Sequence, residues 1–219
     1  MKPLSECRLY SFVDTAYLHG RSPQAVAQGL CDGGSDLIQL RAKGSSLDEI
    51  RQMAEAILPV MRRAGVPLVL NDHPQVAAEV GAQLCHLGQE DFFGAGYRHY
   101  RHVSGVVSPD ESPKMGLSSH APDQAERAIR AGAAYIAVGP VYATGTKPNA
   151  VPVTLDYVRW AAKNVKIPWF AIGGITLENL DDVLAAGARR ICAVSAILNA
   201  ADVATACRKF KERIASFSP

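Results

Sequence analysis

PLVLNDHPQVAAEVGAQLCHLGQED, residues 67–91, contains one complete strand–helix–strand unit. Its two apolar runs, Pro67–Leu70 and Leu84–Leu87, have the near-continuous hydrophobicity of parallel strands that are buried on both faces. The segment between them, Gln75–Val80, has a helical pattern and is followed by Gly81. This order predicts a βαβ unit, in which the two strands are parallel neighbours.

The same alternation continues along the chain. Further strand-like runs are Leu9–Val13, Leu37–Leu40, Lys114–Leu117, Tyr135–Val138, Trp169–Ile172 and Ile191–Val194. Further helical patterns are Ser22–Gly33, Leu47–Ala64, Pro122–Ala131, Leu155–Asn164, Leu177–Ala186 and Asp202–Phe217. Strands that alternate with helices, without a long linker, predict one α/β domain over residues 1–219, a closed (β/α)₈ TIM barrel. An open doubly wound sheet is the alternative.

Several helix ends carry local signals. Ser46 with Glu49 three residues later predicts a capping box. A glycine follows or ends five of the helical patterns, which predicts the left-handed conformation at each of them. These glycines are Gly33, Gly65, Gly81, Gly132 and Gly187.

The unit between Asp91 and Gly116 is poorly periodic, which predicts a short or irregular fourth helix and a mobile loop. Two arginines and two histidines lie within Phe92–His102. They indicate either an anion site or a solvated surface segment, and the solvated surface is favoured.

The composition limits the classes of protein. The chain has 219 residues, is 48% hydrophobic and has a formal net charge of +2, so it has the core of a globular domain and no overall charge that favours nucleic acid. The five cysteines are scattered without metal-binding spacing, which predicts reduced thiols in a cytoplasmic protein. Residues 1–20 lack the apolar segment of a secretory signal, and no apolar run reaches membrane-spanning length, so we expect no membrane partner.

Charged side chains follow the first four strands. Barrel enzymes place their active sites at the carboxyl ends of the strands. Asp14 follows the first strand. Arg41 and Lys43 follow the second and face the same side of an extended segment, because they are two residues apart. They fit a phosphate chain, or they are an ordinary surface pair. Asn71-Asp72 and Asp91 follow the third and fourth strands.

Asp72 and Asp91 carry the strongest of these signals. Neighbouring parallel strands lie about 5 Å apart, and carboxylates brought that close repel each other unless a cation lies between them. A few oxygen ligands with room for water describe Mg²⁺ bound together with a substrate phosphate. The alternative for each residue is an N-cap, which suits Asp72 better because no clean helix follows Asp91.

The last four strands are followed by hydroxyls, glycines and a lysine. Ser118 could bind a polar ring or a phosphate, or cap the next helix, and His120 is an acid/base group or, as favoured for a lone histidine, a hydrogen-bonded neighbour of the site. The loop Thr144–Lys147 suits phosphate, because small residues let backbone N–H groups approach an anion. Gly174 and Ser195 follow the last two strands, where barrels often bind phosphate at the start of a short helix.

These residues form two candidate anion pockets. One combines Arg41, Lys43 and Lys147 with a divalent ion, and the other combines Gly174 and Ser195 with the hydroxyls of Thr144 and Thr146. Such a pair fits a reaction that joins a diphosphate-bearing donor to a phosphate-bearing acceptor. The sequence shows no Ser-His-Asp or Cys-His nucleophile set.

Several motifs, taken together, resemble the thiamine phosphate synthase family. They are Gln39–Lys43, Asn71-Asp72, His86–Asp91, Ser118–His120, Gly139–Tyr142, Thr144–Lys147, Ala171–Ile175 and Val194–Ile197, and they span nearly the whole chain. The resemblance implies that 4-amino-5-hydroxymethyl-2-methylpyrimidine diphosphate is coupled to hydroxyethylthiazole phosphate, which gives thiamine phosphate and pyrophosphate. It also implies a dissociative reaction, in which pyrophosphate leaves before the thiazole nitrogen attacks.

The resemblance implies a role for individual residues. It implies that Asp72 and Asp91 bind Mg²⁺. It implies a pyrimidine diphosphate pocket of Gln39, Arg41, Lys43, Asn71, Ser118 and Lys147, of which Arg41, Lys43, Ser118 and Lys147 are catalytic. It implies a thiazole phosphate pocket of Thr144, Gly145, Thr146, Gly174, Val194 and Ser195.

Two other functions compete with this one. A thiazole tautomerase on the same barrel would use His120 as its acid/base group, but it gives no reason to keep the diphosphate and metal residues. A non-catalytic barrel that senses thiazole or thiamine phosphate is the second alternative, although the sequence shows no DNA-binding module. The sequence leaves open the oligomeric state, a homo-oligomer included, as well as the physiological metal, the binding order and the role of Phe92–His102.

Overall fold

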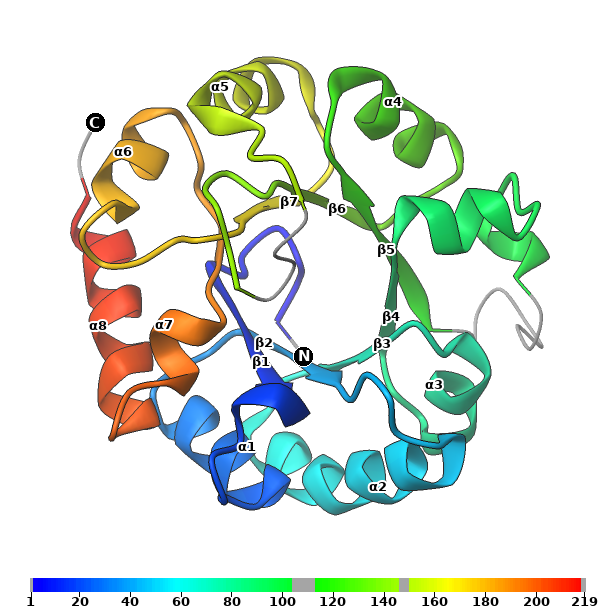
Figure 1. Ribbon diagram of the computed structural model, residues 1–219, viewed down its shortest axis with the longest axis vertical. Helices are drawn as coiled ribbons and strands as arrows, with labels where there is room; N and C mark the ends of the chain where they lie inside the picture. The colour runs from blue at the N-terminus through cyan, green and yellow to red at the C-terminus, as the bar shows by residue number, and fades with distance from the viewer. Residues whose placement is uncertain (1, 104–112, 146–149, 218–219) are drawn as a thin grey trace.

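The strands of the protein close into a parallel barrel that is surrounded by helices (Figure 1). The structure is a computed structural model and describes residues 2–103, 113–145 and 150–217. β1 (Leu9–Asp14) pairs with β2 (Leu37–Arg41) on one side and with β8 (Ile191–Cys192) on the other, so the sheet has no open edge. The predicted TIM barrel is therefore confirmed, and the open sheet is excluded.

Most predicted strands are correct to within two residues. The remaining strands are β3 (Leu68–Asn71), β4 (Leu84–Leu87), β5 (Lys114–Ser119), β6 (Tyr135–Val138) and β7 (Trp169–Ile172). The prediction for the eighth strand is wrong at its end, because the strand stops at Cys192 and not at Val194. The carbonyl of Val194 instead accepts the N–H of Leu198 at 2.9 Å, so Val194 is the N-cap residue of the short helix α7 (Ser195–Leu198).

The helices also follow the predicted order. They are α1 (Pro23–Asp32), α2 (Leu47–Ala64), α3 (Pro74–Val80), α4 (Pro122–Arg130), α5 (Thr154–Asn164), α6 (Leu180–Ala185) and α8 (Val203–Ser216), with the 3₁₀ turn η1 (Thr15–Tyr17) after β1. α6 begins later than the predicted Leu177. The reason is that the side chain of Asn179 accepts the N–H of Thr176 at 2.9 Å and holds the preceding residues in a turn.

Two predicted helix-end signals have different outcomes. The capping box is confirmed, because Glu49 donates its N–H to the Ser46 hydroxyl and accepts the Ser46 N–H in return. The left-handed conformation predicted for Gly33 is wrong, because its φ is −78° and the left-handed residue is Gly34, with φ +83°. The other four glycines have positive φ, as predicted.

The fourth unit is irregular, as predicted. It contains a π-helical turn, η2 (Glu90–Gly94), and a 3₁₀ turn, η3 (Tyr100–His102). Arg98, Arg101 and His102 are exposed, as the solvated-surface interpretation predicts. The predicted mobile loop falls largely on residues 104–112, which lie outside the described residues.

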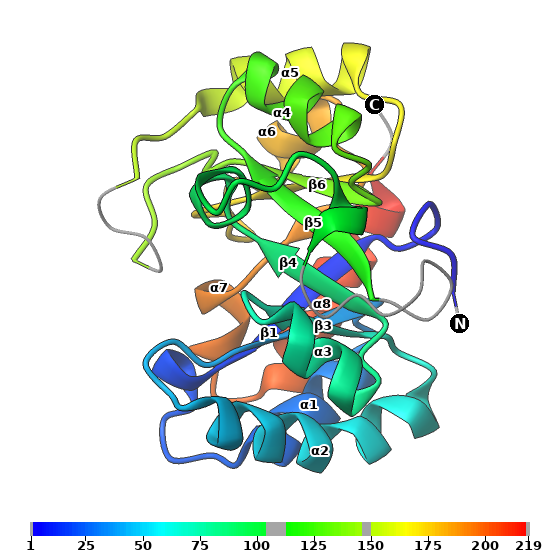
Figure 2. The same cartoon turned by 90° about the vertical axis from the view of Figure 1, so that its right-hand side faces the viewer.

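The interior of the barrel has two zones. At one level three aromatic rings fill it, because Tyr10 and Tyr135 each pack edge-on against Phe170. Towards the carboxyl ends of the strands the interior becomes a pocket. Figure 2 shows α7 and the loop after β6 at one end of the barrel and the N-terminus at the other. Among the described residues, none of the helices combines the length and apolarity that crossing a membrane requires.

Candidate active site

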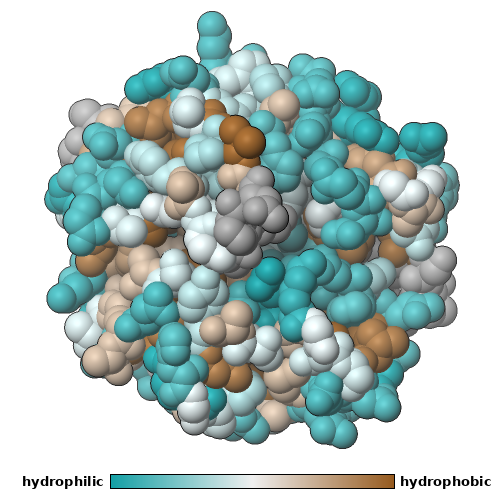
Figure 3. Space-filling view, in the orientation of Figure 1, coloured by the Kyte–Doolittle hydropathy of each residue, from teal (hydrophilic) through white to brown (hydrophobic). Residues whose placement is uncertain are grey.

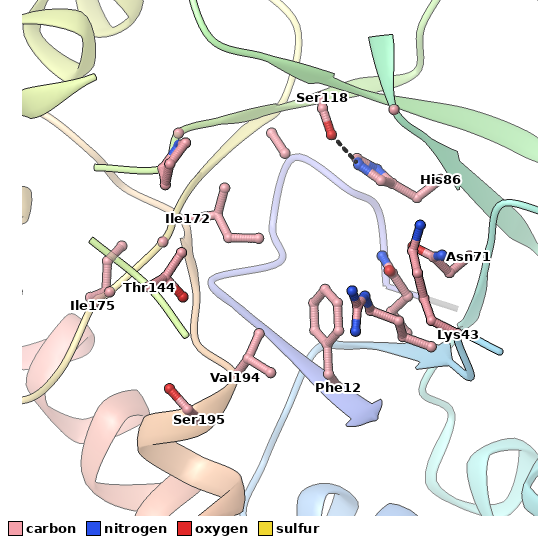
Figure 4. Close-up of a pocket in the computed structure, with 18 of the residues that line it drawn as sticks. Phe12, Lys43, Asn71, His86, Ser118, Thr144, Ile172, Ile175, Val194 and Ser195 are labelled. Carbon is pink, nitrogen blue, oxygen red and sulfur yellow. Dashed lines mark hydrogen bonds between the residues drawn. The ribbon is translucent and has the colours of Figure 1, made fainter. Parts of the chain in front are cut away.

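The pocket at the carboxyl ends of the strands receives side chains from every strand or the loop that follows it (Figure 4). Eleven of the predicted site residues line it, together with His120. They are Gln39, Arg41, Lys43, Asn71, Asp72, Asp91, Ser118, Thr144, Gly174, Val194 and Ser195. Hydrophilic side chains also gather near the centre of this face of the molecule (Figure 3).

Both cations that follow β2 lie against carboxylates. Arg41 contacts Asp14 at 2.9 Å, and Lys43 contacts Asp72 at 3.0 Å. Asp14 is fully buried, and its other oxygen accepts the N–H of Ala16 at 3.0 Å, so the Arg41 guanidinium is held in a fixed position. Arg41 is therefore not an ordinary surface residue, whereas Lys43 is an exposed cation at the rim of the pocket, paired with Asp72.

The N-cap interpretation of Asp72 is wrong. The residue before α3 is His73, and no side chain caps that helix. Asp72 has φ +65°, a conformation that a non-glycine residue rarely adopts, and its N–H donates to the carbonyl of His86 at 2.9 Å. Its carboxylate accepts a hydrogen bond from the Asn71 amide at 2.6 Å. This turn directs Asp72 into the pocket.

Asp91 reaches the same pocket from the π-helical turn after β4. A side chain at Gly88 would collide with it, because a Cβ there would lie 2.6 Å from Oδ2 of Asp91. Within the described residues no group of three or more His, Cys, Asp or Glu side chains converges on one point. Two aspartates that line the same pocket nevertheless fit Mg²⁺, which is commonly bound by one or two carboxylates, water and substrate phosphate oxygens.

The opposite side of the pocket is formed by backbone and hydroxyl groups. Gly173 and Gly174 have φ values of +101° and +63°, and they pass so close to the loop after β6 that a Cβ would lie 2.3 Å from Pro140 and 2.5 Å from the carbonyl oxygen of Ala143. Ser195 begins α7 beside them. Closely packed glycines and a hydroxyl provide the kind of surface on which a phosphate is bound.

Of the remaining three predicted residues, Gly145 does not line the pocket and the other two are not described. Gly145 lies beside Tyr17, whose hydroxyl would be 3.7 Å from a Cβ at this glycine. Thr146 and Lys147 lie outside the described residues, so their roles remain predictions.

Ser118 and His120 occupy different environments. Ser118 does not cap a helix, because it lies within β5 and its hydroxyl is 3.0 Å from Nε2 of His86. His120 lies at the rim, where its ring Nδ1 is hydrogen-bonded to the carbonyl of Gly139 and its backbone N–H donates to Oε1 of Gln124. These contacts match the interpretation of His120 as a hydrogen-bonded neighbour of the site.

A family model described as thiamine monophosphate synthase matches residues 9–197. The chain belongs to this family. It is 48% identical over 183 residues to a thiamine-phosphate synthase of Thermus thermophilus, and the match covers 83% of this chain and 84% of that one. It is 38% identical over 208 residues to the thiamine-phosphate synthase of Halalkalibacterium halodurans, covering 94% and 95% of the two chains. Thiamine phosphate pyrophosphorylase from Pyrococcus furiosus superposes with a TM-score of 0.84, at 26% identity over 98% of each chain.

For this member of the thiamine monophosphate synthase family, sequence reasoning assigned no role to several residues that line the pocket. They include Phe12, His86, Gly88, Pro140, Ile172 and Ile175. His86 had a usable signal, because it is a polar residue inside the apolar run of β4 and lies two positions from Leu84, on the inward face. The apolar residues had none, since an inward-facing Phe or Ile looks the same whether it fills the core or lines a pocket.

Proposed function

We propose that this protein couples 4-amino-5-hydroxymethyl-2-methylpyrimidine diphosphate to hydroxyethylthiazole phosphate, which yields thiamine phosphate and pyrophosphate. The observation that carries the proposal is that one pocket contains the described residues of both candidate anion sites. Arg41, Lys43, Asp72 and Asp91 lie on the side of β2 to β4, and the Gly173-Gly174 turn lies on the side of β7. Two phosphorylated substrates can therefore meet inside the barrel.

The cationic side suits the departure of the diphosphate. In the proposed reaction the bond between the pyrimidine methylene carbon and the diphosphate oxygen breaks first, and its electron pair leaves with the oxygen. The guanidinium of Arg41, which Asp14 holds at 2.9 Å, and the ammonium of Lys43 stabilise the negative charge that grows on the leaving group. Mg²⁺ held by Asp72 and Asp91 would add positive charge at the same place.

The other side suits the acceptor. The phosphate of the thiazole would bind at Gly174, Ser195 and Thr144, which orients the thiazole nitrogen towards the methylene cation so that its lone pair forms the new C–N bond. Apolar side chains line the space between the two phosphate sites, among them Phe12, Ile172 and Val194. They exclude water that would otherwise capture the cation.

A coupling assay tests the proposal. Purified protein is mixed with both substrates, with and without Mg²⁺, and thiamine phosphate and pyrophosphate are measured. We expect both products to form together and only with the metal. Asp91→Asn should reduce the rate by at least about 100-fold, because it removes charge at the metal. Asp156→Asn, at an exposed position on α5, is the matched control.

If the coupling assay fails, the thiazole tautomerase is the function to test next. Conversion of a thiazole phosphate tautomer without coupling would replace the proposal with the tautomerase, and His120→Asn would then abolish that conversion.

For the compartment we propose the cytoplasm, since all five cysteines are free thiols, as is usual under reducing conditions.

A further inference from the structure

A chain of side-chain hydrogen bonds crosses the interior of the barrel beneath the pocket. It begins at Gln39, whose Nε2 donates to the hydroxyl of Tyr10. The Tyr10 hydroxyl lies 3.0 Å from that of Tyr135, and the Tyr135 hydroxyl lies 3.1 Å from Nδ1 of His86. Nε2 of His86 lies 3.0 Å from the hydroxyl of Ser118, a contact drawn in Figure 4. Gln39 and Ser118 both line the pocket, so the chain links two sides of it.

The middle of this chain is sealed from solvent. Tyr10 is 1% exposed and Tyr135 is 0% exposed. Gly116 makes room for the second ring, because a Cβ at this position would lie 2.0 Å from Cζ of Tyr135. Burial raises the pKa of both phenols well above the ordinary value of 10.0, so each keeps its proton and supplies one donor at neutral pH.

The direction of the hydrogen bonds follows from the donor at one end. An amide NH₂ group only donates, so the Tyr10 oxygen accepts from Gln39 and its own hydrogen points to Tyr135. The Tyr135 hydrogen then points to Nδ1 of His86, which must be unprotonated. A neutral imidazole with an unprotonated Nδ1 carries its hydrogen on Nε2, so His86 donates to Ser118.

The polarity of this chain sets which groups its ends show to a ligand. At one end Tyr10 engages one N–H of the Gln39 amide and orients this group, whose carbonyl oxygen is an acceptor and whose second N–H remains a donor. At the other end Ser118 accepts from His86, which leaves its hydroxyl hydrogen as a donor. A 4-aminopyrimidine carries the matching groups, since its amino group donates and its ring nitrogens accept. A 4-oxopyrimidine reverses the pattern, because its oxygen accepts and the neighbouring ring nitrogen donates.

We infer that Tyr10 and Tyr135 are positioning residues that set the hydrogen-bond polarity of Gln39, His86 and Ser118 and thereby select an aminopyrimidine over an oxopyrimidine. This inference rests on the proposed function and adds to it the origin of ring selectivity. The two tyrosines act through Gln39 and Ser118 and do not touch the ligand themselves. Among the described residues, neither of them lines the pocket.

The test compares two substrates in one variant. Tyr135→Phe removes the hydroxyl and keeps the ring that packs against Phe170. The coupling rate is measured with the 4-amino and with the 4-oxo pyrimidine diphosphate. We expect the wild type to prefer the amino compound by at least about 100-fold in kcat/KM. The reason is that the oxo compound would leave buried polar groups of the site without hydrogen-bond partners, which strongly disfavours its reaction. In Tyr135→Phe the preference should fall at least tenfold, while the KM for the thiazole phosphate stays unchanged.

A matched control separates polarity from folding. Tyr157→Phe also deletes a buried phenol hydroxyl, one that contacts the Ser119 hydroxyl and the Ala121 carbonyl outside the chain of hydrogen bonds. This control should lose a comparable amount of stability and keep the substrate preference. If Tyr135→Phe does not fold, Tyr10→Phe interrupts the same chain one link earlier.

A second readout is independent of catalysis. Nitrogen-15 NMR of the free protein reports the histidine tautomer, with the His86 signals identified by their loss in His86→Asn. We expect an unprotonated Nδ1 and a protonated Nε2 in the wild type, and a mixture of tautomers in Tyr135→Phe. A proton on Nδ1 of the wild type, or an unchanged preference in a folded Tyr135→Phe, overturns the inference. A wild type that couples neither substrate overturns the proposed function, and the His86 tautomer then decides the polarity alone.

Discussion

Replacing Lys43 with methionine should affect Mg²⁺ binding and diphosphate binding in opposite directions. In the free protein the Lys43 ammonium lies 3.0 Å from Asp72. A divalent cation needs the same carboxylate oxygens, so Lys43 competes with the metal until a diphosphate is present. Once the diphosphate binds, the ammonium can move to the phosphate oxygens and contribute to binding. Methionine keeps most of the apolar stem and removes only the charge.

The magnitude follows from the exposure of this ion pair. The Lys43 side chain is 54% exposed and that of Asp72 is 21% exposed, so water screens the attraction. Exposed ion pairs contribute roughly 0.2–1 kcal/mol, and about 1.4 kcal/mol corresponds to a factor of ten. Without diphosphate, Lys43→Met should therefore bind Mg²⁺ about 1.5-fold to 5-fold more tightly. The KM for the pyrimidine diphosphate should rise by about 10-fold to 100-fold, because a charge-assisted hydrogen bond contributes about 1.5–3 kcal/mol.

Calorimetric titration of the free protein with Mg²⁺ measures the first effect, and coupling kinetics at saturating thiazole phosphate measure the second. Lys166→Met is the control, because it removes an exposed ammonium that donates to the carbonyl of Lys163, away from the pocket. It should change neither quantity. Mg²⁺ affinity that is unchanged or weaker in Lys43→Met would refute the competition between the ammonium and the metal.

Two further predictions concern glycines that frame the site, and a third concerns two buried thiols that do not line the pocket. Gly116→Ala should destabilise the protein by about 1–3 kcal/mol and lower its Tm by several degrees in a thermal melt, because its Cβ would lie 2.0 Å from the buried Tyr135 ring; an unchanged Tm would contradict this packing. Gly174→Ala should raise the KM for the thiazole phosphate at least tenfold and leave the pyrimidine KM within about threefold in steady-state kinetics, because it displaces the turn beside the proposed phosphate site; equal changes in both would refute the division of the pocket. Burial raises the pKa of the Cys7 and Cys207 thiols to about 11 from an ordinary 9.0, so the unfolded state loses these protons first as pH rises. Their contribution to the free energy of unfolding is complete below pH 9 and should disappear by about pH 11 in urea melts, and Cys207→Ser should make that decline shallower.

Local patterns in the sequence predicted most of the barrel. The apolar runs that become β4, β6 and β7 have the bounds expected of them, because a strand buried on both faces needs hydrophobic residues at every position. The end of β8 was missed for a physical reason. Val194 is as apolar as a strand residue, and only the hydrogen bond from Leu198 to its carbonyl shows that it caps α7.

One general property of barrels predicted which residues meet in the pocket. Residues that follow parallel strands meet at one end, so Arg41, Asp72, Asp91 and Ser118 could be placed in one pocket before their contacts were known. The sequence also allowed Asp72 to be the N-cap of the following helix. The left-handed turn at this residue, supported by a hydrogen bond to the neighbouring strand, excludes that alternative.

By itself, the sequence determined that the chain forms a barrel and which strand ends carry charge, because periodicity and the residues after each strand are local properties. Only the tertiary structure decided which charges pair and which hydroxyls meet. The contacts of Asp14 with Arg41 and of Tyr10 with Tyr135 join residues 27 and 125 positions apart. They depend on strand register and on closure of the barrel, and those follow from the packing of the whole chain.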